Sequence, residues 1–283
     1  MSQPTPSSAL PPVGTDRPRR VRIQHLSAAK QAGERLTMLT AYDAVTARIF
    51  DEAGIDILLV GDSIGDNMLA HPNTIPVTMD ELIPAVRAVA RSTARTMVVA
   101  DLPFGSYEAS PAHAWEASAR MLKEGGAHAV KLEGGRQIAE HVALLTGGGI
   151  PVFGHLGLTP QAENILGGKR VQGRSEEAAK AMLEDARALQ EAGAVALVLE
   201  MVPAPVAQRL TDELDIPTIG IGAGAGCDGQ VLVWLDMAGM GSWAPRFSKQ
   251  FAQIGTELRN AARAFADEVR EGAFPAAEHT FQE

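Results

Sequence analysis

The chain has 283 residues, of which 46% are hydrophobic and 21% are charged, a balance typical of a folded globular protein. Its formal net charge of -9 disfavours general binding to nucleic acid or to anionic membranes. The single cysteine, Cys227, excludes an intrachain disulfide and a cysteine zinc cluster, and its glycine-rich, acidic surroundings predict an inert thiol. No apolar stretch approaches the roughly 20 residues of a membrane span.

Residues 1–20 are rich in proline and serine and lack hydrophobic periodicity, so we predict a disordered tail there. This segment has no apolar run typical of an export signal. Together with the single thiol, that favours the cytoplasm as the compartment. We expect residues 21–283 to form one domain.

From about residue 35, short apolar segments alternate with amphipathic helical segments. The apolar segments are mostly continuous in hydrophobic residues, as expected for parallel strands buried on both faces. Eight of them are found: RLTMLTAY, DILLVGD, TMVVADLP, AVKLEGG, IPVFGHLG, VALVLEMV, IPTIGIGAG and QVLVWLD. Eight strands alternating with helices favour a (β/α)8 barrel over a doubly wound sheet.

Three of the intervening helices carry recognisable start signals or lengths. Thr78 and Glu81 have the spacing of a capping box, although Pro84 predicts that this helix begins later or kinks. Ser175 precedes two glutamates and an apolar stripe at helical spacing, which indicates a helix N-terminus. A long final helix is predicted over residues 245–271.

Carboxylates stand at the ends of four predicted strands, namely Asp62, Asp101, Glu133 and Glu200. The carboxyl ends of barrel strands converge on one site, and buried carboxylates need compensating partners. The first three come from neighbouring strands, and an all-oxygen ligand set suits Mg²⁺. The alternative is that each carboxylate caps a helix or forms a structural ion pair.

Two basic side chains can face the same site, one on the strand of Glu133 and one on the next strand. Lys131 lies two residues before Glu133 and shares its face, so it can bind a substrate carboxylate, stabilise an enolate or pair with the acids. A Schiff base is less favoured, since neighbouring carboxylates keep the amine protonated. His155 can donate to substrate or metal-bound water, shuttle a proton, or be a core histidine. Glycines at 220–224 allow either close ligand approach or a bend.

Several of these residues lie in longer motifs, in order along the chain: MLTAYD at 38–43, VGDSIG at 60–65, ADLPF at 100–104, VKLEGG at 130–135, GHLGLTPQ at 154–161, VQGR at 171–174, LVLE at 197–200, IGIGAG at 219–224 and FPAAEHTF at 274–281. From about residue 21 to its end, the chain resembles the ketopantoate hydroxymethyltransferase (3-methyl-2-oxobutanoate hydroxymethyltransferase) family of pantothenate biosynthesis.

The resemblance implies a (β/α)8 TIM barrel of the phosphoenolpyruvate/pyruvate type, dependence on Mg²⁺, and a cytoplasmic homo-oligomer, typically a decamer. It also implies a reaction. A hydroxymethyl group passes from 5,10-methylenetetrahydrofolate, the co-substrate, to 3-methyl-2-oxobutanoate, and 2-dehydropantoate forms through a Mg-stabilised enolate. The implied partners are these small molecules, with neither nucleic acid nor membrane.

The resemblance further assigns roles to individual residues. The implied metal ligands are Asp62, Asp101 and Glu133. The implied contacts with the 2-oxo acid are Asp62, Ser63, Asp101 and Lys131, with His155 beside the same pocket. The implied acid/base catalyst is Glu200, which would remove a proton from C3 of the 2-oxo acid.

The sequence departs from the family pattern at Asp66, His71, Lys169 and Leu235. None of these positions is an implied metal ligand or an implied contact with the 2-oxo acid. We therefore expect them to affect folate affinity and loop motion. The alternative function is another Mg-dependent, enolate-forming carbon–carbon lyase or phosphonomutase of the same barrel type. Many of those enzymes carry a reactive-cysteine loop, which has no counterpart here. A non-catalytic barrel is the third reading.

Overall fold

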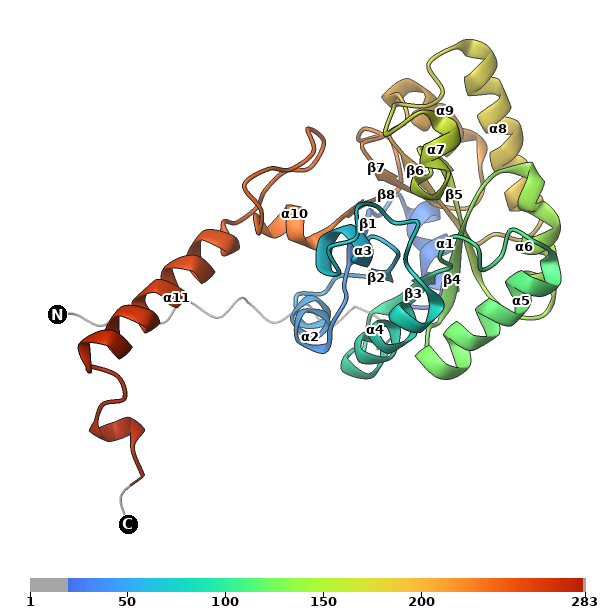
Figure 1. Cartoon of the computed structure of the whole chain (residues 1–283). Helices are drawn as coiled ribbons and strands as arrows, with labels where there is room; N and C mark the ends of the chain where they lie inside the picture. Colours follow the sequence, from blue (N-terminus) through green and yellow to red (C-terminus); the bar gives the residue numbers. More distant parts are fainter. Residues whose placement is uncertain (1–19, 282–283) are drawn as a thin grey trace.

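In a computed structural model, which describes residues 20–281, eight parallel strands close into a barrel in chain order (Figure 1). The strands are β1 Leu36–Thr40, β2 Ile57–Val60, β3 Met97–Asp101, β4 Ala129–Glu133, β5 Val152–Gly157, β6 Ala196–Glu200, β7 Thr218–Ile221 and β8 Gly229–Leu232. The first seven lie within predicted apolar segments, β8 begins one residue ahead of its segment, and the (β/α)8 prediction is confirmed. Of the predicted tail, residues 1–19 lie outside the described part.

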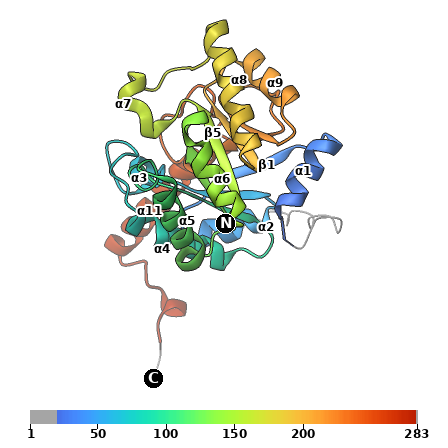
Figure 2. The same ribbon diagram turned by 90° about the vertical axis from the view of Figure 1, so that its right-hand side faces the viewer.

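The helices lie outside the barrel strands, and most of them surround the barrel (Figure 2). They are α1 Ile23–Ala32, α2 Ala44–Glu52, α3 Ile64–Met68, α4 Met79–Ser92, α5 Pro111–Arg120, α6 Ala139–Gly147, α7 Glu163–Leu166, α8 Glu176–Glu191, α9 Ala204–Glu213, α10 Trp234–Ala238 and α11 Ile254–Glu271. A π-helical turn, Met121–Gly125, continues α5. Over the described residues, no helix combines the length and apolar character needed to cross a membrane.

The strands are buried on both faces, and this divides the hydrophobic core into two clusters. The inner cluster fills the barrel and includes Met38, Val99 and Phe153, with Leu26 of α1 packed into it. The outer cluster joins the strands to the surrounding helices through residues such as Leu58. Because α1 packs against the inner cluster at the amino ends of the strands, where Lys30 contacts Asp228 just before β8, the carboxyl ends are left for a site.

The predicted cap signals define the starts of two outer helices. Thr78 and Glu81 form the predicted capping box, with the Thr78 amide 2.8 Å from the Glu81 carboxylate, and α4 begins directly at Met79. The helix continues through Pro84, so a later start is not observed. At α8, the Ser175 hydroxyl accepts a hydrogen bond from the Ala178 amide.

The last helix departs from the sequence-based expectation. It begins at Ile254 and not near residue 245, because residues 241–253 form an irregular segment ahead of it. It points away from the barrel (Figure 1), and none of its residues is buried. The helix that follows β8 directly is the short α10, and α11 comes after it. Among the described residues, the Phe274 ring packs on Phe265 of the amphipathic α11 at 5.7 Å between centroids, but no residue of the helix is buried.

Candidate active site at the carboxyl ends of the strands

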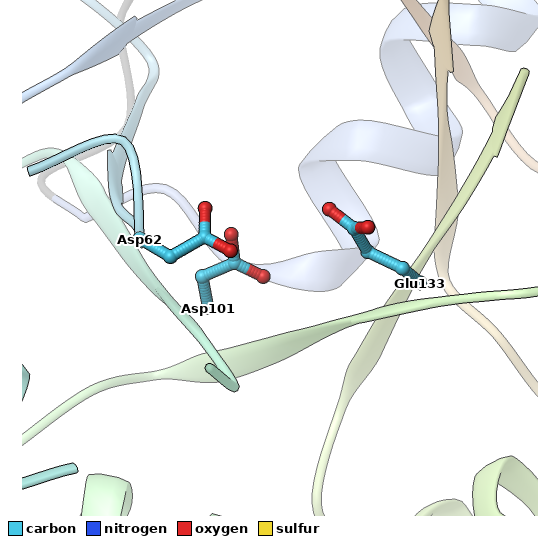
Figure 3. A group of neighbouring side chains, drawn as sticks. All are labelled: Asp62, Asp101 and Glu133. Atoms are coloured by element: carbon cyan, nitrogen blue, oxygen red, sulfur yellow. The ribbon is translucent and has the colours of Figure 1, made fainter. Parts of the chain in front are cut away.

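Three buried carboxylates lie together at one end of the barrel (Figure 3). Asp62 follows β2, Asp101 ends β3 and Glu133 ends β4. One oxygen from each lies within 4.8 Å of the others, a spacing that allows all three to hold one metal ion. Gly61 permits the close approach of β2 and β3, since a β-carbon there would lie 2.9 Å from Asp101 Oδ2.

Lys131 supplies the positive charge nearest to these acids. Its Nζ lies 2.8 Å from Asp101 Oδ1 and 3.6 Å from Glu133 Oε1. Burial opposes its charge, but the carboxylates outweigh burial and raise the pKa of Lys131. Burial and repulsion from the other two acids nevertheless raise the pKa of Asp62 well above its usual value. A single lysine thus leaves an excess of negative charge at the site.

His155 connects this cluster to Glu200. Its Nδ1 lies 3.2 Å from both Lys131 Nζ and Glu133 Oε1, and its Nε2 lies 3.4 Å from Glu200 Oε2. Burial and Lys131 lower the pKa of His155, but its interactions with the two glutamates outweigh them and raise it. Strand register explains the arrangement, since Glu133 pairs with His155 and Gly157 pairs with Glu200.

Glu200 differs from the other acids in its access to solvent. Its side chain is 18% exposed, whereas those of Asp101 and Glu133 are 3% and 4% exposed. The next residue, Met201, has a φ of 48°, an uncommon conformation for a side chain of this size. Local strain of this kind often occurs at functional sites. Glu200 is therefore the acid best placed to meet a substrate entering from solution.

Two tyrosines and a glutamine complete the site, and sequence reasoning did not single them out. The Tyr42 hydroxyl lies 2.8 Å from Ser63 Oγ, which orients the serine predicted to contact substrate. The Tyr107 hydroxyl lies 2.7 Å from Gln161 Oε1, and Gln161 in turn contacts Asp62. The available signal was that these are the chain's only tyrosines and that Tyr42 and Gln161 lie in MLTAYD and GHLGLTPQ, two of the segments that carry the family resemblance.

The four positions that depart from the family pattern make their contacts outside the cluster of three acids. Lys169 Nζ lies 3.6 Å from Asp66 Oδ2, so two of the departures from the family pattern form one ion pair. His71 pairs with Glu81 at 3.1 Å, on the side of α4. Leu235 is a half-buried residue that packs against the outer core cluster.

Two further features favour structural roles over chemistry. At Gly222, in the glycine segment, φ is 63° and a β-carbon would lie 3.0 Å from the Phe247 ring, so this glycine accommodates the ring. Cys227 is buried, and burial raises the pKa of its thiol, in agreement with an inert group.

The barrel and its strand-end acids define the class: a (β/α)8-barrel enzyme whose site is built from carboxylates with one buried lysine. The chain belongs to the ketopantoate hydroxymethyltransferase family, whose model matches residues 20–277. The 3-methyl-2-oxobutanoate hydroxymethyltransferase of Saccharopolyspora erythraea is 59% identical over 281 residues, 99% of this chain and 96% of that protein. The enzyme of the same name from Thermobifida fusca is 56% identical and covers 99% of this chain and 100% of its own length. The resemblance inferred from the motifs is confirmed.

Solved structures that share the fold are more distant. Phosphonopyruvate hydrolase in complex with oxalate and Mg²⁺ superposes with a TM-score of 0.59 at 15% identity, covering 91% of this chain and 92% of its own. 2,3-dimethylmalate lyase, a member of the PEP mutase/isocitrate lyase superfamily, gives a TM-score of 0.56 at 16% identity over 92% and 91%. At these identities the likeness concerns the fold, and it confirms the predicted barrel type.

Proposed function

We propose that the chain transfers a hydroxymethyl group from 5,10-methylenetetrahydrofolate to 3-methyl-2-oxobutanoate, giving 2-dehydropantoate. The observation that carries this proposal is full-length relatedness of 55–59% identity to enzymes named for that reaction. The gathering of Asp62, Asp101 and Glu133 beside Lys131 supports it, since a 2-oxo acid needs both a cation for its oxygens and a base for its C3 proton.

The three carboxylates are suited to hold Mg²⁺. They offer only oxygen donors, they are buried, and their ligand atoms lie within 4.8 Å of one another. Burial is the largest cause that raises the pKa of Asp62 and Asp101, and the negative charge of the neighbouring acids adds to it, which Lys131 offsets only in part. A divalent cation is the kind of ligand that would balance it. When bound, Mg²⁺ supplies a Lewis acid that polarises the keto oxygen of the substrate.

Residues of the chain bind the substrate, stabilise the enolate and remove the proton. Lys131 faces the substrate oxygens as a fixed positive charge that stabilises the enolate. Ser63, oriented by Tyr42, binds the 2-oxo acid. Glu200 removes the C3 proton, and His155 Nε2 holds its carboxylate in place. The C3 carbon attacks the methylene carbon of the folate as one of its two carbon–nitrogen bonds breaks. Water then replaces the second nitrogen to leave the hydroxymethyl group, and the two nitrogens take up the proton from Glu200 and one proton from water.

The first experiment measures 2-dehydropantoate formed from the two substrates with Mg²⁺ and with excess chelator. We expect product with Mg²⁺, loss of product with chelator, and recovery when Mg²⁺ is restored. Omitting the folate should abolish product, which separates this function from that of a carbon–carbon lyase on the same barrel. Turnover that survives the chelator would contradict the metal role, and 3-methyl-2-oxobutanoate that is never converted would contradict the substrate.

We also propose that residues 21–283 act as one catalytic domain in a cytoplasmic homo-oligomer, a decamer. The supporting observation is that α11 exposes apolar side chains along its length, namely Ile254, Leu258, Phe265 and Val269. On the barrel, α2 exposes Val45 and Ile49. A monomer would leave both apolar surfaces in water, and burying them between subunits is favourable.

Charge introduced on the apolar side of α11 should break this assembly. We expect Leu258→Glu to shift the sedimentation coefficient toward smaller species, because a carboxylate is costly to bury in an apolar contact. Asn260→Glu adds the same charge on another face of the helix and is the matched control, with wild-type sedimentation expected. Unchanged assembly of Leu258→Glu would argue against α11 as the contact surface.

A further inference from the structure

Gln161 contacts the carboxylates at the ends of β2 and β4, although it belongs to the 3-10 turn Pro160–Ala162 that follows β5. It is buried, with 5% of its surface exposed. Its side-chain Nε2 donates to Asp62 Oδ2 and to the Leu102 carbonyl, both at 2.8 Å. Its backbone amide donates to Glu133 Oε2 at 3.0 Å. One residue therefore bonds to two of the three acids.

Tyr107 determines which way the Gln161 amide faces. The tyrosine hydroxyl accepts a hydrogen bond from the Glu133 amide at 3.2 Å and donates to Gln161 Oε1 at 2.7 Å. With its oxygen engaged by the phenol, the amide presents Nε2 to two acceptors, Asp62 and the Leu102 carbonyl. A flipped amide would place its oxygen against both of those acceptors, so the observed orientation is the one the network allows.

In Asp62 and in Glu133, these contacts engage one carboxylate oxygen and leave the other without a bond to Gln161. Asp62 has Oδ2 held and Oδ1 free of Gln161, and Glu133 has Oε2 held while Oε1 faces Lys131 and His155. The donors are neutral amides, so they fix the carboxylates without adding positive charge that would repel a cation. Hydrogen bonds of this kind to ligating carboxylates orient them and tune metal affinity.

We propose that Gln161, oriented by Tyr107, is a positioning residue that sets the orientation of Asp62 and Glu133 and thereby the affinity for Mg²⁺. The inference rests on the proposed metal role of these acids. It adds a residue that makes no direct contact with the metal in this arrangement. Its signature is a change in metal binding by the folded protein in the absence of any substrate.

The test is a calorimetric titration of metal-free protein with MgCl₂. Gln161→Met keeps the length of the side chain and removes its amide, and we expect it to weaken Mg²⁺ binding about 10-fold or more. The matched control is Gln208→Met, because Gln208 also donates to an aspartate, Asp212, at 2.8 Å, but on the exposed side of α9. It should bind Mg²⁺ as the wild type does.

Each outcome is decisive. If folded Gln161→Met binds Mg²⁺ with wild-type affinity, the positioning role is wrong, whatever happens to its unfolding temperature. If that variant does not fold, Tyr107→Phe takes its place, with a loss of a few-fold expected and wild-type affinity overturning the proposal. A wild-type protein that binds no Mg²⁺ would instead contradict the proposed function itself, which separates the two failures.

Discussion

Replacing Glu200 with glutamine is expected to lower turnover by about 10²- to 10⁴-fold, the usual contribution of a positioned general base. Glutamine keeps the shape of the side chain and its contact distance to His155 Nε2, but it cannot accept a proton. Glu200 is the acid at this site with partial access to solvent, and its neighbours are already engaged with Lys131. No other carboxylate is as free to take over its role.

Exchange of the C3 hydrogen of 3-methyl-2-oxobutanoate in D₂O, followed by NMR without folate, isolates the proton-removal step. Glu200→Gln should abolish enzyme-dependent exchange and keep Mg²⁺ binding close to wild type. The matched control is Glu213→Gln, since Glu213 also pairs with basic side chains, Arg187 and Arg209, but on the outer helix α9. Wild-type exchange in Glu200→Gln would rule out Glu200 as the base.

Replacing Lys131 with methionine is expected to lower the free energy of unfolding of the metal-free protein by about 3–5 kcal/mol. The substitution keeps the apolar stem and removes the one ammonium group that lies against Asp101 and Glu133. Breaking a buried ion pair from one side leaves uncompensated charge, which costs far more than the pair itself contributes. Turnover should also be lost, because the fixed charge facing the enolate is removed.

The loss in stability should depend on pH in a definite direction. Burial raises the pKa of Asp62 and Asp101 in the folded protein. A carboxylate whose folded pKa exceeds its unfolded value contributes stability at low pH, and this is lost as the pH rises through the folded pKa. Without Lys131 both values rise further, so the deficit should be smallest in acid and grow as the pH passes above the usual carboxylate range.

Urea unfolding at fixed protein concentration, across pH and with or without Mg²⁺, measures these effects. Mg²⁺ should restore part of the lost stability, because it binds the folded state. Lys30→Met is the matched control. Lys30 pairs with Asp228 at the same 2.8 Å distance, but Asp228 precedes β8 and therefore lies at the amino end of that strand, away from the cluster of acids. Its stability should not respond to Mg²⁺. A pH-independent deficit in Lys131→Met would contradict the electrostatic explanation.

The amino-acid sequence by itself determined the fold and the positions of the acids. Continuous apolar segments encode burial on both faces, and eight of them separated by helical segments leave few architectures other than a closed parallel barrel. Asp62, Asp101 and Glu133 could be placed together because the carboxyl ends of adjacent strands must meet at one end of such a barrel. The motifs around them identified the family.

Only the tertiary structure decided which partners each group has. The sequence left Lys131 open between substrate contact and ion pair, and the structure places its Nζ against Asp101 and Glu133. Gln161 and Tyr107 could not be recognised, because a glutamine in a loop after β5 meets Asp62 only once the barrel has closed. Likewise, the exposed α11 is amphipathic like any packed helix. The periodicity of apolar residues shows which face of a helix is favourable to bury. Which surface covers that face depends on where the helix lies in the folded protein.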